Sequence, residues 1–420
     1  MIRSLSHAAL LVCAASIVRA QPTSQRSAPP PQQAVPVDLL YQTGANVTIS
    51  LLTMGSGEQV WELFGHDAIW IHDNTSGRDT VFNWGVFNFQ QPGFIQRFLK
   101  GTMWYGMGGD PLGLQMATYR YLNRTVIAQE LDLTVAQRDS ILHQIQWYAR
   151  PENVNYRYDY YRDNCATRVR DIIDNAIGGQ IRAKAGALTG TSYRWHSLRL
   201  MQSNKPIMLG VDIGLGRPAD RDITQWQEMF LPRKLHDFVA TLQIRDSTGA
   251  MRPLVKRETV LFKSTRPPEP EAPPTRWPWL LVGGLFVAAL FLVLGRGAAA
   301  EGRVAKVLAA LIVSIWSLVA GLLGTVIALL WAGTDHVFAH WNENLLLFNP
   351  LWFILAVFAI PALWTRRKSA PFRRWAFGLA ALASLALIAH IVRLSAQDNL
   401  AIICLALPPA LAVAWIARRA

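Results

Sequence analysis

Five apolar segments in the C-terminal third of this chain of 420 residues constrain its fold more than any other feature. Each is about as long as a helix must be to cross the hydrocarbon core of a bilayer, which takes roughly 20 apolar residues. The sequence therefore predicts an all-α membrane domain of five transmembrane helices over residues 277–420. The predicted spans are 277–295, 307–331, 345–364, 375–393 and 399–417.

The positive charge of the chain is concentrated around these segments. The formal net charge is +13, and residues 276–420 hold 12 Lys and Arg against 4 Asp and Glu. Basic residues follow the first, third and fifth segments, whereas the other two loops carry Asp335, Glu343 and Asp398. By the positive-inside rule the first set of loops is cytoplasmic, so the first span enters from outside. Membrane orientation thus explains the positive charge. The sequence shows no basic stripe of the kind that binds phosphates, so nucleic acid is not expected as a partner.

The N-terminus indicates the same orientation. Residues 1–20 have a charged start at Arg3, an apolar stretch and small residues before Ala20, which is typical of a secretory signal peptide. The Pro/Gln/Ser-rich run 21–37 predicts a disordered tether. These features predict a multi-pass membrane protein whose large domain is extracytoplasmic.

Residues 38–262 have the length of one globular domain. Strands are predicted at 46–53, 67–72 and 80–89, and helices near 92–100, 134–149, 165–177 and 223–243. The mixture of elements predicts an α+β fold for this domain. The proline- and charge-rich residues 263–276 predict an extended, poorly packed linker to the membrane domain.

Cys165 is the only cysteine of the predicted exported domain. Cys13 lies in the predicted signal peptide, and Cys404 lies in the fifth apolar segment, where a small apolar residue is expected. An unpaired thiol in an oxidising compartment calls for a reason, and reactivity is one. Asp163 or Asn164 can cap a helix that begins at Cys165, and the positive end of that helix favours a thiolate. The alternative is an inert cysteine that packs the helix start.

A thiol nucleophile needs a base, and His66 is the best placed of the five histidines of this domain. It follows a glycine and begins a strand-like run, so it lies on a rigid element. The patterns around His72, His143 and His236 favour surface or packing roles, and His196 stays undecided.

The order of His66 in FGHDAIWI and Cys165 in NCATRVRD resembles that of circularly permuted papain-like thiol enzymes and lecithin:retinol acyltransferase-like proteins. Four stretches in the same order resemble the Lnb family, whose N-terminal periplasmic domain precedes a multi-span membrane domain. They are DTVFNWGVFNF (79–89), YRDNCATRVRD (161–171), LGRPADRDITQWQEMFLP (215–232) and DHVFAHWNENLLLFNPL (335–351). The resemblance covers nearly the whole mature chain. It implies a multi-pass protein of the bacterial inner membrane, with a permuted papain-like fold for its periplasmic domain.

Members of the Lnb family are implicated in lipoprotein N-acylation, the transfer of a fatty acyl chain to the α-amine of a lipoprotein's N-terminal cysteine. The resemblance therefore implies a thiol acyltransferase with Cys165 as nucleophile and His66 as base. Its implied partners are a phospholipid donor, a lipoprotein acceptor and the bilayer, and no cofactor is expected. Asn83, and less strongly Asp79, are the candidates to orient His66, and the Cys165 backbone N–H is the candidate oxyanion donor.

Other residues are candidates for substrate binding. His336, His340 and Asn344 lie in the outward loop after the second span, either as ordinary polar loop residues or as a lipid or acceptor site. The sequence disfavours a metal site at the two histidines. Trp84 and Tyr105 belong to an aromatic group that is mostly core, although some of its members could line an acyl groove.

Two other functions fit the same sequence. An envelope hydrolase, such as a peptidase, an amidase or a phospholipase, would use the same thiol and base but would not need five membrane spans. An envelope receptor or assembly factor would use the periplasmic domain for binding alone. The sequence does not specify the acceptor, the chain length or the oligomeric state.

Overall fold

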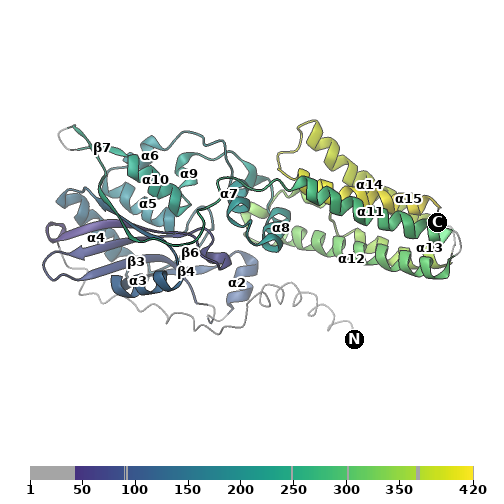
Figure 1. Ribbon diagram of the computed structural model, residues 1–420, viewed down its shortest axis with the longest axis horizontal. Coiled ribbons are helices and arrows are strands. Elements are labelled where there is room, and N and C mark those ends of the chain that lie inside the picture. The colour runs from purple at the N-terminus through teal and green to yellow at the C-terminus, as the bar shows by residue number, and fades with distance from the viewer. Residues whose placement is uncertain are drawn as a thin grey trace. The chain divides into compact units, whose positions relative to one another are not determined.

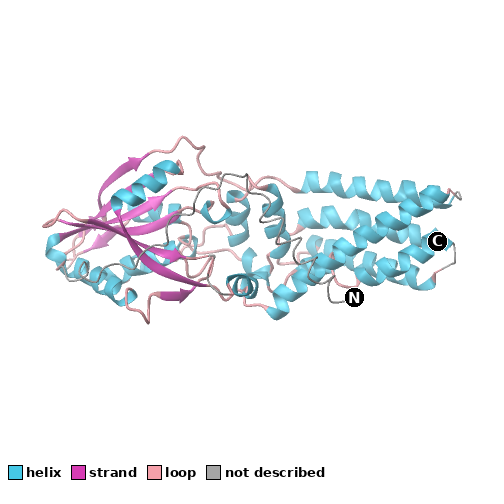
Figure 2. Ribbon diagram, turned by 90° about the horizontal axis from the view of Figure 1, so that it is seen from below, coloured by secondary structure: helices cyan, strands magenta, loops and turns pink. Residues whose placement is uncertain are grey.

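The computed structural model describes residues 43–88, 90, 93–246, 249–299, 302–365 and 369–419. Several predictions lie outside the described residues: the signal peptide (1–20) with Cys13, the tether (21–37), Phe89, and the basic residues Arg366, Arg367 and Lys368. Figure 1 and Figure 2 show an N-terminal region of strands and helices followed by a C-terminal region of long helices.

A seven-stranded antiparallel sheet forms the centre of the N-terminal domain, with the order β6-β4-β3-β2-β1-β5-β9. Its strands are β1 (Val47–Met54), β2 (His66–Asp73), β3 (Asp79–Val86), β4 (Trp104–Pro111), β5 (Val126–Leu131), β6 (Asn155–Arg157) and β9 (Val255–Phe262). A separate hairpin pairs β7 (Gln243–Arg245) with β8 (Met251–Pro253). The three predicted strands correspond to β1, β2 and β3, and the third ends at Val86.

Helices cover both faces of this sheet, which confirms the α+β prediction (Figure 1). They are α2 (Phe94–Lys100), α3 (Leu112–Tyr121), α4 (Val135–Tyr148), α5 (Cys165–Ala176), α6 (Gln180–Lys184), α7 (Tyr193–Leu200), α8 (Lys205–Gly214), α9 (Gln225–Glu228) and α10 (Pro232–Thr241). The face that carries Ile69 packs on α4, α5 and α10, and the face that carries Ala68 packs on α3. The helix predicted at 223–243 is two helices, because Pro232 begins α10 and cannot continue α9.

The membrane domain contains four helices that are long and apolar enough to cross a bilayer and one shorter apolar helix, counted over the described residues. They are α11 (Trp277–Ala299), α12 (Arg303–Gly333), α13 (Trp352–Thr365), α14 (Ala370–Ile391) and α15 (Leu400–Arg419). The shorter helix is α13, of 14 residues with Pro361 inside it. The predicted third span, 345–364, was wrong at its start, because a 3-10 turn and a loop occupy residues 343–351.

Asparagine side chains of that loop cap the C-terminal end of α8. Asn342 Nδ2 donates to the carbonyls of Ile213 and Gly214 at 2.9 and 3.0 Å, and Asn344 Nδ2 donates to Ile213 at 3.0 Å. The last carbonyls of a helix have no partner within it, so these bonds satisfy groups that would otherwise be buried unpaired. Asn344 is fully buried, and its predicted role in substrate binding is replaced by this structural one.

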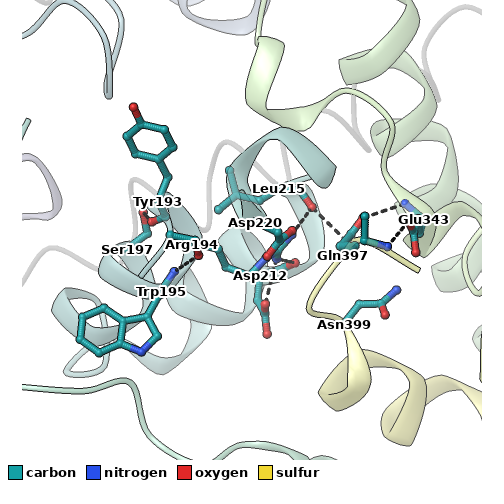
Figure 3. Close-up of polar contacts among 12 residues, drawn as sticks. Tyr193, Arg194, Trp195, Ser197, Asp212, Leu215, Asp220, Glu343, Gln397 and Asn399 are labelled. Atoms are coloured by element: carbon teal, nitrogen blue, oxygen red, sulfur yellow. Dashed lines mark hydrogen bonds and ion pairs between the residues drawn. The ribbon is translucent and has the colours of Figure 1, made fainter. Parts of the chain in front are cut away.

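Buried charges lie beside the capped helix end (Figure 3). Arg194 on α7 pairs with Asp212 at 3.0 Å and with Asp220 at 2.7 Å, and all three side chains are nearly inaccessible to water. Arg194 also donates to the carbonyl of Leu215 at 2.7 Å, which accepts a second bond from Gln397 of the membrane domain at 3.1 Å. Removing one partner would leave a buried charge uncompensated, so the cluster holds together as a unit.

The linker at 263–276 has no helix, no strand and no buried residue, but hydrogen bonds join it to the N-terminal domain. Ser264 Oγ donates to the carbonyl of Asn123 at 2.5 Å, and the carbonyl of Pro270 accepts from Arg199 at 2.8 Å. Composition predicted an extended chain, and hydrogen bonds to the domain surface hold that chain in place.

Gly216, just after α8, gives a test of the contact between the end of α8 and the loop that follows α12. Its N–H donates to the carbonyl of Phe338 at 2.7 Å, and a Cβ atom at Gly216 would lie 2.0 Å from the carbonyl oxygen of His340. Gly216→Ala should therefore destabilise the full chain by roughly 1–3 kcal/mol, through overpacking. Gly210→Ala is the matched control, because a Cβ at Gly210 on α8 meets no atom within 4 Å. Thermal unfolding in nanodiscs measures both, and equal losses would contradict the prediction.

Candidate active site

Asn164 caps the helix that begins at Cys165, which decides between the two predicted caps. The Asn164 side chain accepts from the N–H of Thr167 at 3.0 Å and donates to the carbonyl of Phe230 at 2.9 Å. Asp163 instead forms an ion pair with Arg168. The cap fixes the first turn of α5, so that the Cys165 side chain has one defined position.

The Cys165 thiol lies against β2 and β3 and is partly exposed. Asp67 follows His66 in the chain, and its backbone N–H points at the Cys165 sulfur. A Cβ atom at Gly85 would lie 3.9 Å from Cys165 Cβ and 3.8 Å from the Tyr158 ring. Gly85 has φ +89°, a conformation that favours glycine, and its missing side chain leaves room beside the thiol.

His66 is the first residue of β2, as predicted for a rigid position, and it bonds to Asn83 on β3. Its Nε2 lies 3.0 Å from Asn83 Oδ1, while Asn83 Nδ2 donates to the carbonyl of Val81 at 3.3 Å. The second bond orients the amide, so the oxygen faces the ring and can only accept. Nε2 therefore carries the proton, and Nδ1 is the basic nitrogen, with no hydrogen-bond partner among the described residues.

The two candidate catalytic residues both lie near the N-terminal end of β2. Successive side chains of a strand point to opposite faces, so His66 faces the Ala68 side and Asp67 faces the α5 side. No hydrogen bond joins the His66 ring to the Cys165 sulfur in the contacts that the structure describes. The thiol contacts the backbone at Asp67 instead, so the pair is adjacent along β2 but unbonded.

Burial decides the charge state of both groups. Burial raises the pKa of the Cys165 thiol, and the backbone N–H groups of Asp67, Ala166 and Cys165 oppose that shift without reversing it. Burial lowers the pKa of His66 to about 4, against the hydrogen bond that the ring donates to Asn83, which raises it. The resting site thus holds a neutral thiol and a neutral imidazole, and the thiolate expected from the helix start is not the resting form.

Two charged residues near the thiol were missed by the sequence analysis. The Asp67 carboxyl is fully buried, accepts from Thr53 Oγ1 at 2.8 Å, and has a pKa raised well above its usual value by burial and then by Cys165. Arg124 is buried with its guanidinium 4.9 Å from the Tyr119 ring centre, and its charge lowers the pKa of both His66 and Cys165. Asp67 lies in the FGHDAIWI stretch but was not singled out there, and only the fold brings Arg124 close.

Asp79 and Trp84 do not lie where the sequence analysis put them. Asp79 accepts from Trp70 Nε1 at 2.7 Å and pairs with His72 at 2.8 Å, at the opposite end of β2 from His66. Six residues of strand separate the two ends by roughly 20 Å, so Asp79 does not orient His66. Trp84 is fully buried in the core on the α5 side, so it packs the fold and does not face a substrate.

The two loop histidines hold backbone groups. His336 Nε2 donates to the carbonyl of Phe98 on α2 at 2.9 Å, and His340 Nε2 donates to the carbonyl of Thr334 at 3.0 Å. Both histidines thus have a structural partner through Nε2, and their role in binding a lipid or an acceptor stays a prediction.

Tyr105, by contrast, lies in a row of stacked rings that reaches the thiol. Its ring centre is 4.2 Å from that of Tyr158, which lies beside Cys165, and 5.0 Å from that of Phe87. Phe87 in turn stacks on Phe94 at the start of α2. Aromatic side chains are common in the lining of apolar binding sites, and the substrate-binding role of Tyr105 stays a prediction.

The reactivity of the thiol should follow its raised pKa. Only the thiolate is alkylated, so in a Cys404→Ala background the rate of Cys165 alkylation by iodoacetamide should still rise above pH 9. The measurement is the rate of mass gain of the intact protein against pH. A plateau below about pH 8.5, the ordinary thiol pKa, would mean that the helix start outweighs burial.

Family models match both domains of the chain. Residues 42–204 match the Lnb N-terminal periplasmic domain, and residues 279–417 match the Lnb transmembrane domain. The first match contains Cys165, His66 and Asn83, and the second contains the loop that caps α8. Comparisons with curated proteins and with solved structures find no match.

Proposed function

This chain belongs to the Lnb family, and we propose that it is a membrane-bound thiol acyltransferase. It moves a fatty acyl chain from a phospholipid to the N-terminal amine of a lipoprotein through a thioester on Cys165. The observation that carries the proposal is Cys165 itself, an unpaired thiol at a capped helix start, against the backbone N–H of the residue that follows His66.

In the first step the Cys165 sulfur attacks the ester carbonyl of the phospholipid. The carbon–sulfur bond forms, the thiol proton passes to His66 Nδ1, and the ester carbon–oxygen bond breaks. His66 then gives the proton to the departing glycerol oxygen, which leaves a lysophospholipid. Because thiol and imidazole are neutral at rest, proton transfer accompanies the attack and does not precede it.

In the second step the amine of the acceptor attacks the thioester. The carbon–nitrogen bond forms, the carbon–sulfur bond breaks, and the amine proton returns through His66 to the sulfur. The N–H groups of Cys165 and Ala166 lie in the first turn of α5, where they have no helical partner and can donate to the oxyanion. The buried charge of Arg124 favours the same negative charge.

The membrane domain supports a lipid donor. Residues of its outward loop are hydrogen-bonded to α2 and α8, and Phe338 packs 4.6 Å from the ring centre of Tyr161, four residues before the thiol. A hydrolase of a water-soluble substrate would have no use for a thiol positioned in this way by membrane helices.

Replacing the thiol tests the proposal directly. The full chain in vesicles of radiolabelled phosphatidylethanolamine should gain one acyl chain on Cys165, seen by intact-protein mass spectrometry, and pass the label to a reporter lipoprotein. Cys165→Ala should abolish both, and His66→Ala should slow adduct formation by about 10²–10⁴-fold. Free labelled fatty acid without labelled lipoprotein would indicate a hydrolase, and full activity of Cys165→Ala in cells would indicate a receptor.

Asn83 and Asp79 form a matched pair for the positioning role. Asn83→Ala should slow thioester formation by about 10- to 100-fold through misorientation of the His66 ring, whereas Asp79→Asn should leave the rate unchanged. The acid limb of kcat/KM should have its midpoint near the His66 pKa of about 4. The hydrogen bond to Asn83 raises that pKa, so its loss in Asn83→Ala should move the midpoint to lower pH. A slower rate with an unmoved acid limb would make Asn83 merely structural.

A further inference from the structure

We propose that α2 (Phe94–Lys100) is an interfacial helix that lies in the periplasmic leaflet of the bilayer, and that a phospholipid acyl chain reaches Cys165 along the rings behind it. The docking of α2 on lipid does not depend on the proposed function, whereas the route to Cys165 rests on the proposed function. The occupant of this surface is thus the phospholipid of the membrane in which the chain is embedded.

One side of α2 is apolar and uncovered. Ile95, Phe98 and Leu99 are 63%, 40% and 48% exposed, and their spacing places them on one side of the helix. Phe94 points inward and is buried. Three large apolar side chains exposed on seven residues mark a contact surface, since single exposed apolar residues are ordinary but clusters are not.

Hydrogen bonds hold α2 at the end of a membrane span. The N–H of Asp335, two residues after α12, donates to the carbonyl of Lys100 at 2.8 Å, and His336 donates to the carbonyl of Phe98. A Cβ atom at Gly101 would lie 3.0 Å from backbone atoms of Asp335 and His336, so the two segments touch without side chains between them. The last residues of α2 therefore lie within a few residues of the membrane-spanning helix.

Tryptophans mark the level of the lipid headgroups at the same place. Trp331, near the end of α12, lies 5.0 Å from Trp341 by ring centres, and Trp279 at the start of α11 is 78% exposed. Tryptophan is enriched where hydrocarbon meets water, so these residues place the periplasmic interface beside α2. Lys100 follows the apolar side chains, as is typical of helices that lie on a phospholipid surface.

The rings behind α2 connect this surface to the thiol. Phe94 stacks on Phe87 at 6.3 Å, Phe87 on Tyr105 at 5.0 Å, and Tyr105 on Tyr158 at 4.2 Å, with Tyr158 beside Cys165. An acyl chain that leaves the leaflet at α2 would meet apolar ring surface until it reaches the sulfur. The ester carbonyl can then arrive at Cys165 while most of the chain stays out of water.

A spin label at Leu99 tests the docking. Leu99→Cys is labelled in the full chain with its native cysteines replaced by alanine, in nanodiscs of phosphatidylethanolamine and phosphatidylglycerol. Met251→Cys is the matched control, at 49% exposed against 48% for Leu99. The Leu99 label should collide more with oxygen and less with a water-soluble nickel complex than the Met251 label. Equal collision profiles, or a Leu99 label that is immobilised and shielded from both probes by protein, would overturn the proposal.

A second measurement tests the route. Phe98→Ser with Leu99→Ser should slow formation of the Cys165 acyl adduct from vesicles of the same lipids by at least about tenfold, because the lost apolar contact weakens docking. The rate with a short-chain, water-soluble acyl ester should not change, and Met251→Ser should change neither rate. An equal loss with both donors overturns the route. No adduct on the unaltered chain with either donor overturns the proposed function, while the spin labels still decide the docking.

Discussion

The capping of one short helix by another domain is the constraint on which the rest of this structure depends. The carbonyls of Ile213, Gly214 and Leu215 end α8, and side-chain amides of the membrane domain satisfy all three. Helix ends are buried only when such partners exist, so the periplasmic domain and the membrane helices cannot separate without exposing or orphaning these groups. The contact accompanies the hydrogen bonds that hold α2 at the end of α12.

The chemistry of the site follows from a competition between burial and polarity. At the start of α5 the free N–H groups favour a thiolate, yet the surrounding protein removes more hydration from the Cys165 sulfur than those groups replace. His66 loses its proton for the same reason. In the mechanism that we propose, such a site keeps the thiol protonated until a carbonyl is in place, which suits a thiol in an oxidising compartment.

Local patterns in the sequence predicted the parts of this fold that local chemistry determines. The helix after Asn164, the strand from His66 and the apolar helices each follow from residues within one window. Longer-range features could not be predicted in that way. Asp79 was a candidate partner of His66 until the register of β2 and β3 placed it beside His72, and the proline-rich linker gave no sign of its hydrogen bonds to Asn123 and Arg199.

Phe338 has a consequence for the order in which the protein is made. It belongs to the membrane domain by sequence, but its ring packs among Tyr161, Tyr193 and Phe230, and the carbonyl of Phe230 in turn holds the cap Asn164. The ribosome synthesises these aromatic residues long before Phe338, which reaches the periplasm only after α12 has crossed the bilayer. The ring of Phe338 can therefore pack beside the cap of α5 only after α12 has been made and the loop that follows it has reached the side where the N-terminal domain lies.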